Sequence, residues 1–115
     1  MYRLYHNNRC SKSREALALL EQKQLQFQVR YYLDDPLTAG ELVALLKALG
    51  MPARQLLRSK EAEYKALGLD NPDLSEQQLI EAMVSTPKLI ERPILQCDDK
   101  AVIGRPVENL LVLLP

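Results

Sequence analysis

One segment of the sequence brings together side chains that could do thiol chemistry. Cys10 closes the stretch YHNNRCSKS, where a strand-like pattern ends and a helical pattern begins at Ser11. A cysteine at the front of a helix faces free backbone N–H groups and the positive end of the helix dipole, and both favour the thiolate over the thiol. Arg9, Lys12 and Arg14 add positive charge nearby. We therefore predict that Cys10 is a nucleophile, the alternative being a small buried apolar side chain.

The same loop contains a histidine but no second cysteine. His6 could support the thiolate or move a proton, because imidazole titrates near neutral pH; the alternative is a histidine at a strand end bonded to backbone. Ser-Lys-Ser follows Cys10, so an external thiol must resolve whatever forms on this sulfur. Cys97 lies in an apolar segment, where we expect it to pack, with a resolving thiol as the alternative.

Three arginines are candidates for binding a tetrahedral oxyanion. Arg58 lies in LLRSKEAEYK, Arg92 in ERPI and Arg105 in IGRP. A guanidinium group offers a planar fork of donors and keeps its charge at any working pH. Each arginine alone would be a surface residue or half of an ion pair, so a functional role requires that they converge on Cys10. Pro93 follows Arg92 and marks either a strand start or a cis proline beside the thiol.

Both ends of the chain have strand patterns. Residues 2–5 and 27–31 alternate between apolar and polar side chains on either side of a helical pattern, which predicts a βαβ unit with parallel strands. Residues 94–97 and 101–103 flank Asp-Asp-Lys, which predicts an antiparallel hairpin. A final helix is expected to start near Pro106, with the proline in its first turn.

The residues between these two parts have helical patterns throughout. Thr-Ala-Gly-Glu at 38–41 and Ser-Glu-Gln-Gln at 75–78 are capping boxes, which open helices. Gly50 is a left-handed helix end. Because no linker or low-complexity tract interrupts the chain, we expect residues 1–115 to form one domain with a helical insertion at about 36–85.

Composition excludes several classes of protein. The 115 residues include 15 basic and 15 acidic side chains, so net charge provides no footprint for nucleic acid or an anionic membrane. No apolar run is longer than that of Leu110–Leu114, which is far shorter than the ~20 residues that cross a bilayer. Two cysteines and one histidine cannot build a usual zinc site. We expect a cytoplasmic protein with no bound metal or cofactor.

Charge is nevertheless unevenly placed along the chain. Residues 1–60 hold ten Lys or Arg against five Asp or Glu, and residues 61–115 hold five against ten. This pattern predicts either two halves that attract one another or a positive pocket recruited from both.

Four segments together resemble the arsenate reductases of the glutaredoxin-linked type, a branch of the thioredoxin-like superfamily. They are YHNNRCSKSR, LLRSKEAEYK, ERPIL and AVIGRP, which follow the order of the family and cover nearly the whole chain. The resemblance implies a thioredoxin-like α/β fold with a mixed four-stranded sheet, Cys10 as nucleophile, His6 as its loop neighbour and Pro93 as a cis proline. It also implies that three arginines bind the oxyanion: Arg58, Arg92 and Arg105.

The activity implied by this resemblance is reduction of arsenate to arsenite through a covalent adduct on Cys10. Glutathione would be the cosubstrate and glutaredoxin a partner. One alternative is a regulator that binds RNA polymerase, whose fold is similar, although that group typically uses a two-cysteine switch that this sequence lacks. Another is a glutathione-dependent thiol reductase acting on a different substrate, with the arginines binding glutathione or a protein carboxylate.

Overall fold

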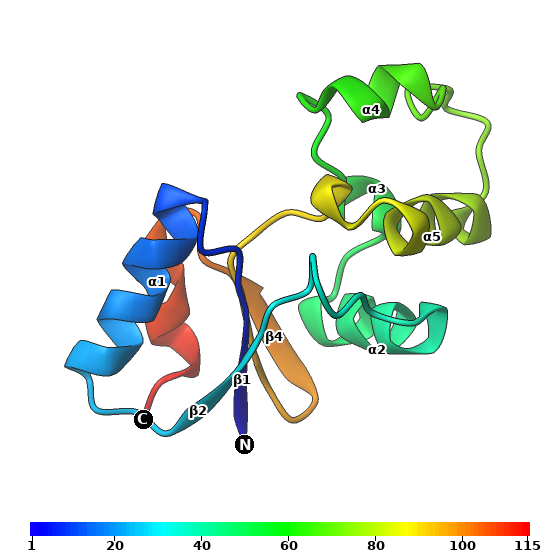
Figure 1. The fold of residues 1–115 in the computed structure, drawn as a ribbon. Helices are drawn as coiled ribbons and strands as arrows, with labels where there is room; N and C mark the ends of the chain where they lie inside the picture. The colour runs from blue at the N-terminus through cyan, green and yellow to red at the C-terminus, as the bar shows by residue number, and fades with distance from the viewer.

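Four short strands form the centre of the fold, and helices lie on both sides of them (Figure 1). The structure is a computed structural model that describes all residues, 1–115. The N-terminal part is β1 (Tyr2–Tyr5), α1 (Ser11–Gln22) and β2 (Phe27–Arg30), and the C-terminal part is β3 (Ile94–Cys97), β4 (Lys100–Ile103) and the 3-10 helix η2 (Val107–Leu113). Between them lie α2 (Ala39–Leu49), α3 (Ala53–Leu56), α4 (Ala62–Ala66), α5 (Glu76–Ser85) and the short 3-10 helix η1 (Pro87–Leu89).

The sheet has the order β2-β1-β3-β4 and is mixed. β1 and β2 are parallel, as the βαβ pattern predicted, and β3 is antiparallel to both β1 and β4. The prediction of a thioredoxin-like α/β fold with a mixed four-stranded sheet is therefore confirmed. Tyr5 pairs with Arg30 on one side and Ile94 on the other, and Ile94 pairs with Ile103. The carboxyl ends of β1, β2 and β4 and the amino end of β3 thus lie at one edge, which we call the site edge.

The sheet separates two apolar cores because successive strand residues point to opposite faces. Leu4 and Leu95, which pair with each other, pack on one face in a cluster completed by Ala16, Leu20 and Leu110 from α1 and η2. Tyr5 and Ile94 belong to a larger cluster of 16 buried residues, most of which come from the helices between β2 and β3. In Figure 1, α1 and η2 accordingly lie on one side of the strands, and α2 to α5 lie on the other.

Local signals in the sequence set the boundaries of the longer helices. Thr38 and Glu41 form the predicted capping box at the start of α2, and Ser75 and Gln78 form the second one at the start of α5. Gly50 ends α2 with a φ of 68°, a conformation that costs glycine no steric strain. Both predicted boxes and the left-handed stop are therefore confirmed.

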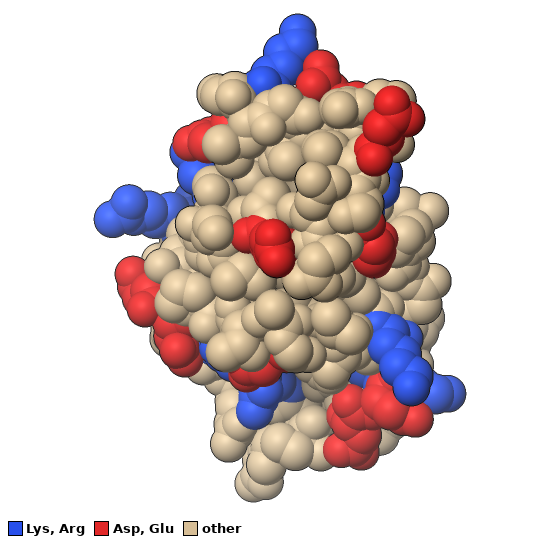
Figure 2. Space-filling model, turned by 90° about the vertical axis from the view of Figure 1, so that its right-hand side faces the viewer, with Lys and Arg blue, Asp and Glu red and all other residues tan.

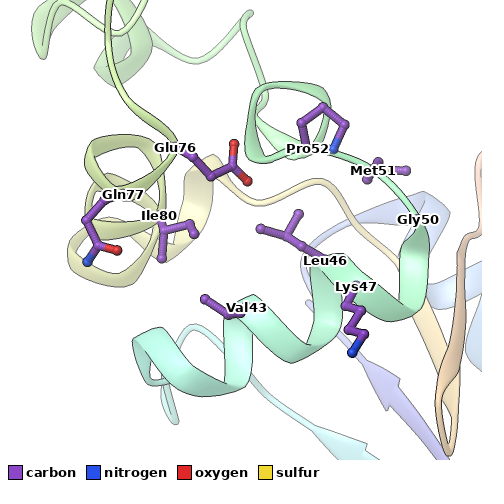
Figure 3. Close-up of a pocket in the computed structure, with 9 residues that line it drawn as sticks. All are labelled: Val43, Leu46, Lys47, Gly50, Met51, Pro52, Glu76, Gln77 and Ile80. Atoms are coloured by element: carbon purple, nitrogen blue, oxygen red, sulfur yellow. The ribbon is translucent and has the colours of Figure 1, made fainter.

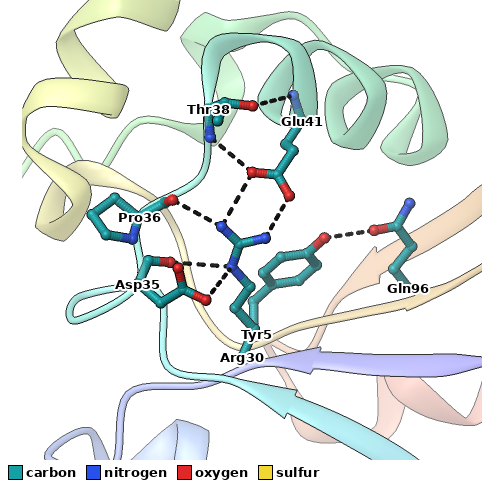
Figure 4. A network of polar contacts seen from close by, with 7 residues as sticks. All are labelled: Tyr5, Arg30, Asp35, Pro36, Thr38, Glu41 and Gln96. Carbon is teal, nitrogen blue, oxygen red and sulfur yellow. Dashed lines mark hydrogen bonds and ion pairs between the residues drawn. The ribbon is translucent and has the colours of Figure 1, made fainter.

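Arg30, the last residue of β2, fixes the start of α2 relative to the sheet (Figure 4). Its guanidinium donates to the carbonyls of Asp35 and Pro36, at 3.1 and 2.8 Å, and to both carboxylate oxygens of Glu41. Glu41 also accepts from the Thr38 amide at 2.9 Å. One carboxylate therefore serves both the capping box and the ion pair that ties the helix to the strand.

The C-terminal segment differs from the prediction of a helix with Pro106 in its first turn. Pro106 precedes η2 in an extended conformation, with φ −68° and ψ 165°, and η2 is a 3-10 helix. The Asn109 amide donates to the Pro106 carbonyl, three residues back, and the Asn109 side chain donates to the carbonyls of Ile103 and Arg105. These bonds fix residues 103–106 against the first turn of η2, and the bond from residue 109 to residue 106 is the three-residue spacing of a 3-10 helix. The predicted hairpin is confirmed, with its turn at Asp98–Asp99.

The face formed by the inserted helices has charges of both signs. Figure 2 shows Lys and Arg side chains toward the margins of this face and Asp and Glu side chains both at the margins and near its centre. No helix has both the length and the apolar character needed to cross a bilayer.

We predict a pH-dependent stability contribution from Glu41. The hydrogen bond from Arg30, followed by that from the Thr38 backbone, lowers the pKa of Glu41 from 4.5 to about 2. Because the folded-state pKa is depressed, the carboxylate stabilises the fold above pH 4.5, and this contribution is lost as the pH falls toward about 2. Glu41→Ala should lower the free energy of unfolding by about 1–2 kcal/mol at pH 7 in urea titrations, and by less at pH 3.

The matched control is Gln78→Ala, because Gln78 holds the same place in the second capping box but is uncharged. Its cost should be equal at pH 7 and pH 3. A cost of Glu41→Ala that does not change with pH would contradict the ionic role of this residue.

Candidate active site

Three chain segments meet at the site edge because the strand register brings their ends together. They are the loop after β1, the residues before β3 and the residues after β4. The Gly104 amide donates to the Pro93 carbonyl at 2.8 Å. A Cβ atom on Gly104 would lie 3.0 Å from side-chain atoms of both Pro93 and Leu110. Glycine is therefore required here so that the segment after β4 can approach the segment before β3.

Cys10 is the N-cap residue of α1 and lies immediately before the first helical turn. Its backbone is extended, and its amide donates to the Asn7 carbonyl at 3.0 Å. The residue is 9% exposed, but the sulfur does not lie among apolar groups alone, because Arg105 Nη2 donates to Sγ at 3.5 Å. The basic neighbours predicted to act on the thiol, Arg9, Lys12 and Arg14, are exposed and make no hydrogen bond to it.

Arg58 and Arg105 face the same carboxylate. Glu91 Oε1 lies 3.6 Å from Arg58 Nε and 3.3 Å from Arg105 Nε. Arg58 also pairs with Glu61 at 2.6 Å. Two arginines from different halves of the sequence thus converge, and one of them contacts the Cys10 sulfur.

The backbone around Arg58 explains how a residue of the helical insertion reaches the site edge. Leu57 and Ile90 form an isolated antiparallel bridge, with the Arg58 amide donating to the Leu89 carbonyl at 2.8 Å. On the other side of the bridge, the Glu91 amide donates to the Leu56 carbonyl at 2.9 Å. This short pairing places Arg58 beside Glu91.

Arg92 combines a positioned backbone with unpaired side-chain donors. Its carbonyl accepts from Arg105 Nε at 2.6 Å, and its peptide bond to Pro93 is cis. Nε and Nη1 of Arg92 are buried and have no hydrogen-bond partner. Because an unpaired buried donor of a charged group is costly, these two N–H groups are available to an anionic ligand.

His6 is buried and turned toward Ser13, with no hydrogen bond to Cys10. His6 Nδ1 lies 2.9 Å from Ser13 Oγ, which also accepts from the Asn7 amide at 3.0 Å. The imidazole stacks edge-on against Tyr31, with ring centroids 5.7 Å apart. Burial, followed by the positive charge of Arg14, lowers the pKa of His6 below its usual value. A neutral histidine therefore supports the loop that carries Cys10.

Cys97 lies at the opposite end of β3 from the site edge. It pairs with Tyr2 and Lys100, whereas the site edge is at Ile94. Both cysteines are free, and Cys97 is half-buried. The geometry thus separates the two thiols by the length of a strand.

Sequence reasoning missed Ser13 and Glu91. Ser13 lies three residues after Cys10 in the first turn of α1, a spacing that places it under the loop. Glu91 directly precedes Arg92, but no pattern distinguishes it from an ordinary surface acid. Its partners, Arg58 and Arg105, can be identified only from the folded structure, in which the strand ends lie together.

Outside the site edge, the surface has a groove between α2 and α5 (Figure 3). Val43, Leu46 and Ile80 line it, and the Glu76 carboxylate accepts from the Ala53 amide at one end, at 2.9 Å. None of its lining residues belongs to the site edge. No group of three or more His, Cys, Asp or Glu side chains is placed to hold a metal ion.

Comparison with known proteins places the chain in a family. A sequence model of the ArsC family matches residues 5–113. The chain belongs to the ArsC family. This confirms the family resemblance inferred from the four segments.

This ArsC-family chain is similar over its full length to several proteins. It is 53% identical to "Uncharacterized protein YfgD" of Escherichia coli K12, with 95% of this chain and 92% of the relative covered. It is 48% identical to "Arsenate reductase" of Haemophilus influenzae, with 96% and 97% covered. Its structure matches "Arsenate reductase from Vibrio cholerae" with a TM-score of 0.96 and 46% identity, covering 98% of this chain and 97% of the other.

We predict that His6 makes stability depend on pH near neutrality. Its folded-state pKa lies below 6.5, so the unfolded chain binds the proton more readily and the free energy of unfolding falls as the pH drops below 6.5. The chain has one histidine. His6→Gln should therefore reduce the slope of stability between pH 7.5 and pH 5.5, measured by urea unfolding at several pH values.

Ser13→Ala is the companion variant. It leaves His6 Nδ1 and the Asn7 amide without a partner and should cost about 1–3 kcal/mol at pH 7.5. An unchanged pH slope in His6→Gln would show that the imidazole titrates alike in the folded and unfolded states.

Proposed function

We propose that this protein is an arsenate reductase that uses Cys10 as nucleophile, glutathione as cosubstrate and glutaredoxin as partner. The observation that carries the proposal is the contact between Arg105 Nη2 and Cys10 Sγ, at 3.5 Å. This contact places the Arg105 guanidinium, which can donate two parallel hydrogen bonds to an anion, beside the one cysteine sulfur at the site edge. Relatives that share 45–48% of their sequence with this chain and are called arsenate reductases support the choice of oxyanion.

The unpaired donors of Arg92 support oxyanion binding independently. Nε and Nη1 have no partner within the protein, and an arsenate oxygen would satisfy them. Arg58 and Arg105 share Glu91, so their positive charges are partly compensated before substrate arrives. We assign oxyanion binding to all three arginines, which stabilise the charge that accumulates during attack.

The proposed reaction converts arsenate and two thiols into arsenite, a disulfide and water. The Cys10 sulfur attacks arsenic, an As–S bond forms and one arsenate oxygen leaves as water. A glutathione thiol then attacks the adduct, and two electrons pass from sulfur to arsenic as arsenite is released. Glutaredoxin reduces the resulting disulfide. An external thiol is needed because no second cysteine lies at the site edge.

The other predicted residues have supporting roles in this proposal. His6 holds the Cys10 loop through Ser13 rather than touching the sulfur, and Pro93 shapes the segment that carries Arg92. We propose that residues 1–115 act as one domain, because the site combines Arg58 from the helical insertion with Cys10 from the βαβ unit. We propose that the protein works in the reducing cytoplasm, because the proposed reaction consumes glutathione.

Cys10→Ser should abolish arsenite production while leaving the thermal unfolding midpoint close to that of the wild type. The reason is that serine keeps the size of the side chain but is a far weaker nucleophile. The assay measures arsenite with purified glutathione and glutaredoxin. Cys97→Ser is the control, and it should retain full activity because Cys97 lies at the far end of β3.

Residual turnover in Cys10→Ser would remove the covalent step from the proposal. The same assay with a glutathione mixed disulfide in place of arsenate tests the alternative of a thiol reductase. If the mixed disulfide were reduced and arsenate were not, that alternative would replace arsenate reduction.

Arg92→Lys should lower kcat/KM for arsenate by about ten- to a hundredfold, because lysine keeps the charge but loses the fork of donors. Arg54→Lys is the matched control. Arg54 donates to Tyr64 and to the carbonyls of Leu69 and Asn71 within the insertion, so its loss should lower stability and leave kcat/KM unchanged. Equal kinetics in Arg92→Lys and the wild type would show that two-pronged binding by Arg92 is irrelevant.

A further inference from the structure

Tyr32 has a buried hydroxyl group that the protein leaves unsatisfied. The side chain is 1% exposed, and its ring belongs to the large apolar cluster on the helical face of the sheet. Its Oη has no hydrogen-bond partner. Burying a hydroxyl without a partner costs about 1–3 kcal/mol. The burial of this unpaired hydroxyl therefore needs a reason, such as a hydrogen bond to a ligand.

The strand register places Tyr32 at the site edge. β2 runs parallel to β1 and ends at Arg30, which pairs with Tyr5, so the residues after both strands emerge at the same edge. The His6 amide donates to the Arg30 carbonyl at 2.9 Å, and the Tyr31 ring contacts the His6 ring. Tyr32, the second residue after β2, therefore lies at the same edge as the segment that leads from β1 to Cys10.

The electrostatic surroundings of Tyr32 are those of the active site. Burial raises the pKa of this hydroxyl, and Coulomb interactions with Cys10 and Glu91 raise the pKa further, whereas those with Arg58 and Arg105 lower it. Four site groups thus lie within electrostatic reach of the phenol. The net result is a group that keeps its proton and can only donate or accept a hydrogen bond at neutral pH.

We propose that Tyr32 is a further oxyanion-binding residue, whose hydroxyl donates a hydrogen bond to an oxygen of the anion held by Arg58, Arg92 and Arg105. The inference rests on the proposed function for the identity of the anion, arsenate. The neutral donor adds no charge to a site in which one carboxylate already faces two guanidinium groups. A bound anion would give this hydroxyl the acceptor that the protein itself does not provide.

The test measures arsenate binding by isothermal titration calorimetry in the Cys10→Ser background, where no covalent adduct can form. Tyr32→Phe removes only the hydroxyl and keeps the buried ring. A hydrogen bond to a charged acceptor predicts that the Kd for arsenate rises about tenfold or more. Tyr5→Phe is the matched control, because Tyr5 is also a buried residue but its hydroxyl donates to Gln96 at 2.7 Å. Its Kd should not change.

Unfolding without ligand gives a second, opposite readout. Tyr32→Phe should be as stable as its parent or more stable, because it removes an unsatisfied group, whereas Tyr5→Phe should be less stable because it breaks a bond. A loss of affinity in Tyr32→Phe together with retained stability cannot come from general disruption of the fold.

The outcomes separate this inference from the proposed function. Equal arsenate affinity of the Tyr32→Phe protein and its parent would overturn the role of Tyr32 and leave the proposed function standing. If Tyr32→Phe weakened arsenate binding only in the protein that retains Cys10, the hydroxyl would act on the sulfur rather than on the anion. This result would also overturn the role of Tyr32 in anion binding. A third combination is that Tyr32→Phe weakens arsenate binding in the Cys10→Ser background while the protein with Cys10 intact does not reduce arsenate. That combination would support the inference and overturn the proposed reaction. No arsenate binding in the parent would overturn both.

Discussion

The arrangement at the site edge depends on one carboxylate, that of Glu91. Two guanidinium groups approach each other there, and like charges in a partly buried place are stable only when an opposite charge faces both. Glu91 Oε1 lies within 3.6 Å of Arg58 Nε and 3.3 Å of Arg105 Nε, and it comes from the segment that also carries Arg92. The same carboxylate therefore holds Arg58 and Arg105 beside each other, and Arg105 contacts the Cys10 sulfur. The donors of Arg92 have no acceptor of this kind.

Much of the fold could be predicted because its signals are local. The capping boxes at Thr38 and Ser75, and the alternation in residues 2–5, act through near neighbours in the sequence. The C-terminal helix does start near Pro106, but its 3-10 type and the place of Pro106 before its first turn could not be predicted in this way. There Asn109 bonds to carbonyls of residues 103, 105 and 106, which are contacts that the sequence does not reveal.

The site residues that could be predicted are those whose type and neighbours stand out in the sequence. The residues that could not be predicted are those whose role depends on contacts made by the folded chain. A cysteine before a helix and an arginine before a proline stand out in a sequence, and the structure brings Cys10, Arg58 and Arg105 to one edge. Tyr32 reads as one more aromatic residue after a strand, and only its buried, unpartnered hydroxyl distinguishes it. His6 was correctly placed in the Cys10 loop, but its hydrogen bond to Ser13 depends on the turn that the loop makes.

The short bridge between Leu57 and Ile90 has a consequence for how such proteins diversify. Arg58 reaches Glu91 from a cluster of helices whose core lies across the sheet from the core that anchors α1. Amino-acid changes that accumulate among those helices can therefore shift Arg58 while the thiol keeps its surroundings. Under the proposed function, the preference for one oxyanion over another and the reactivity of the sulfur can thus evolve independently within a single small chain.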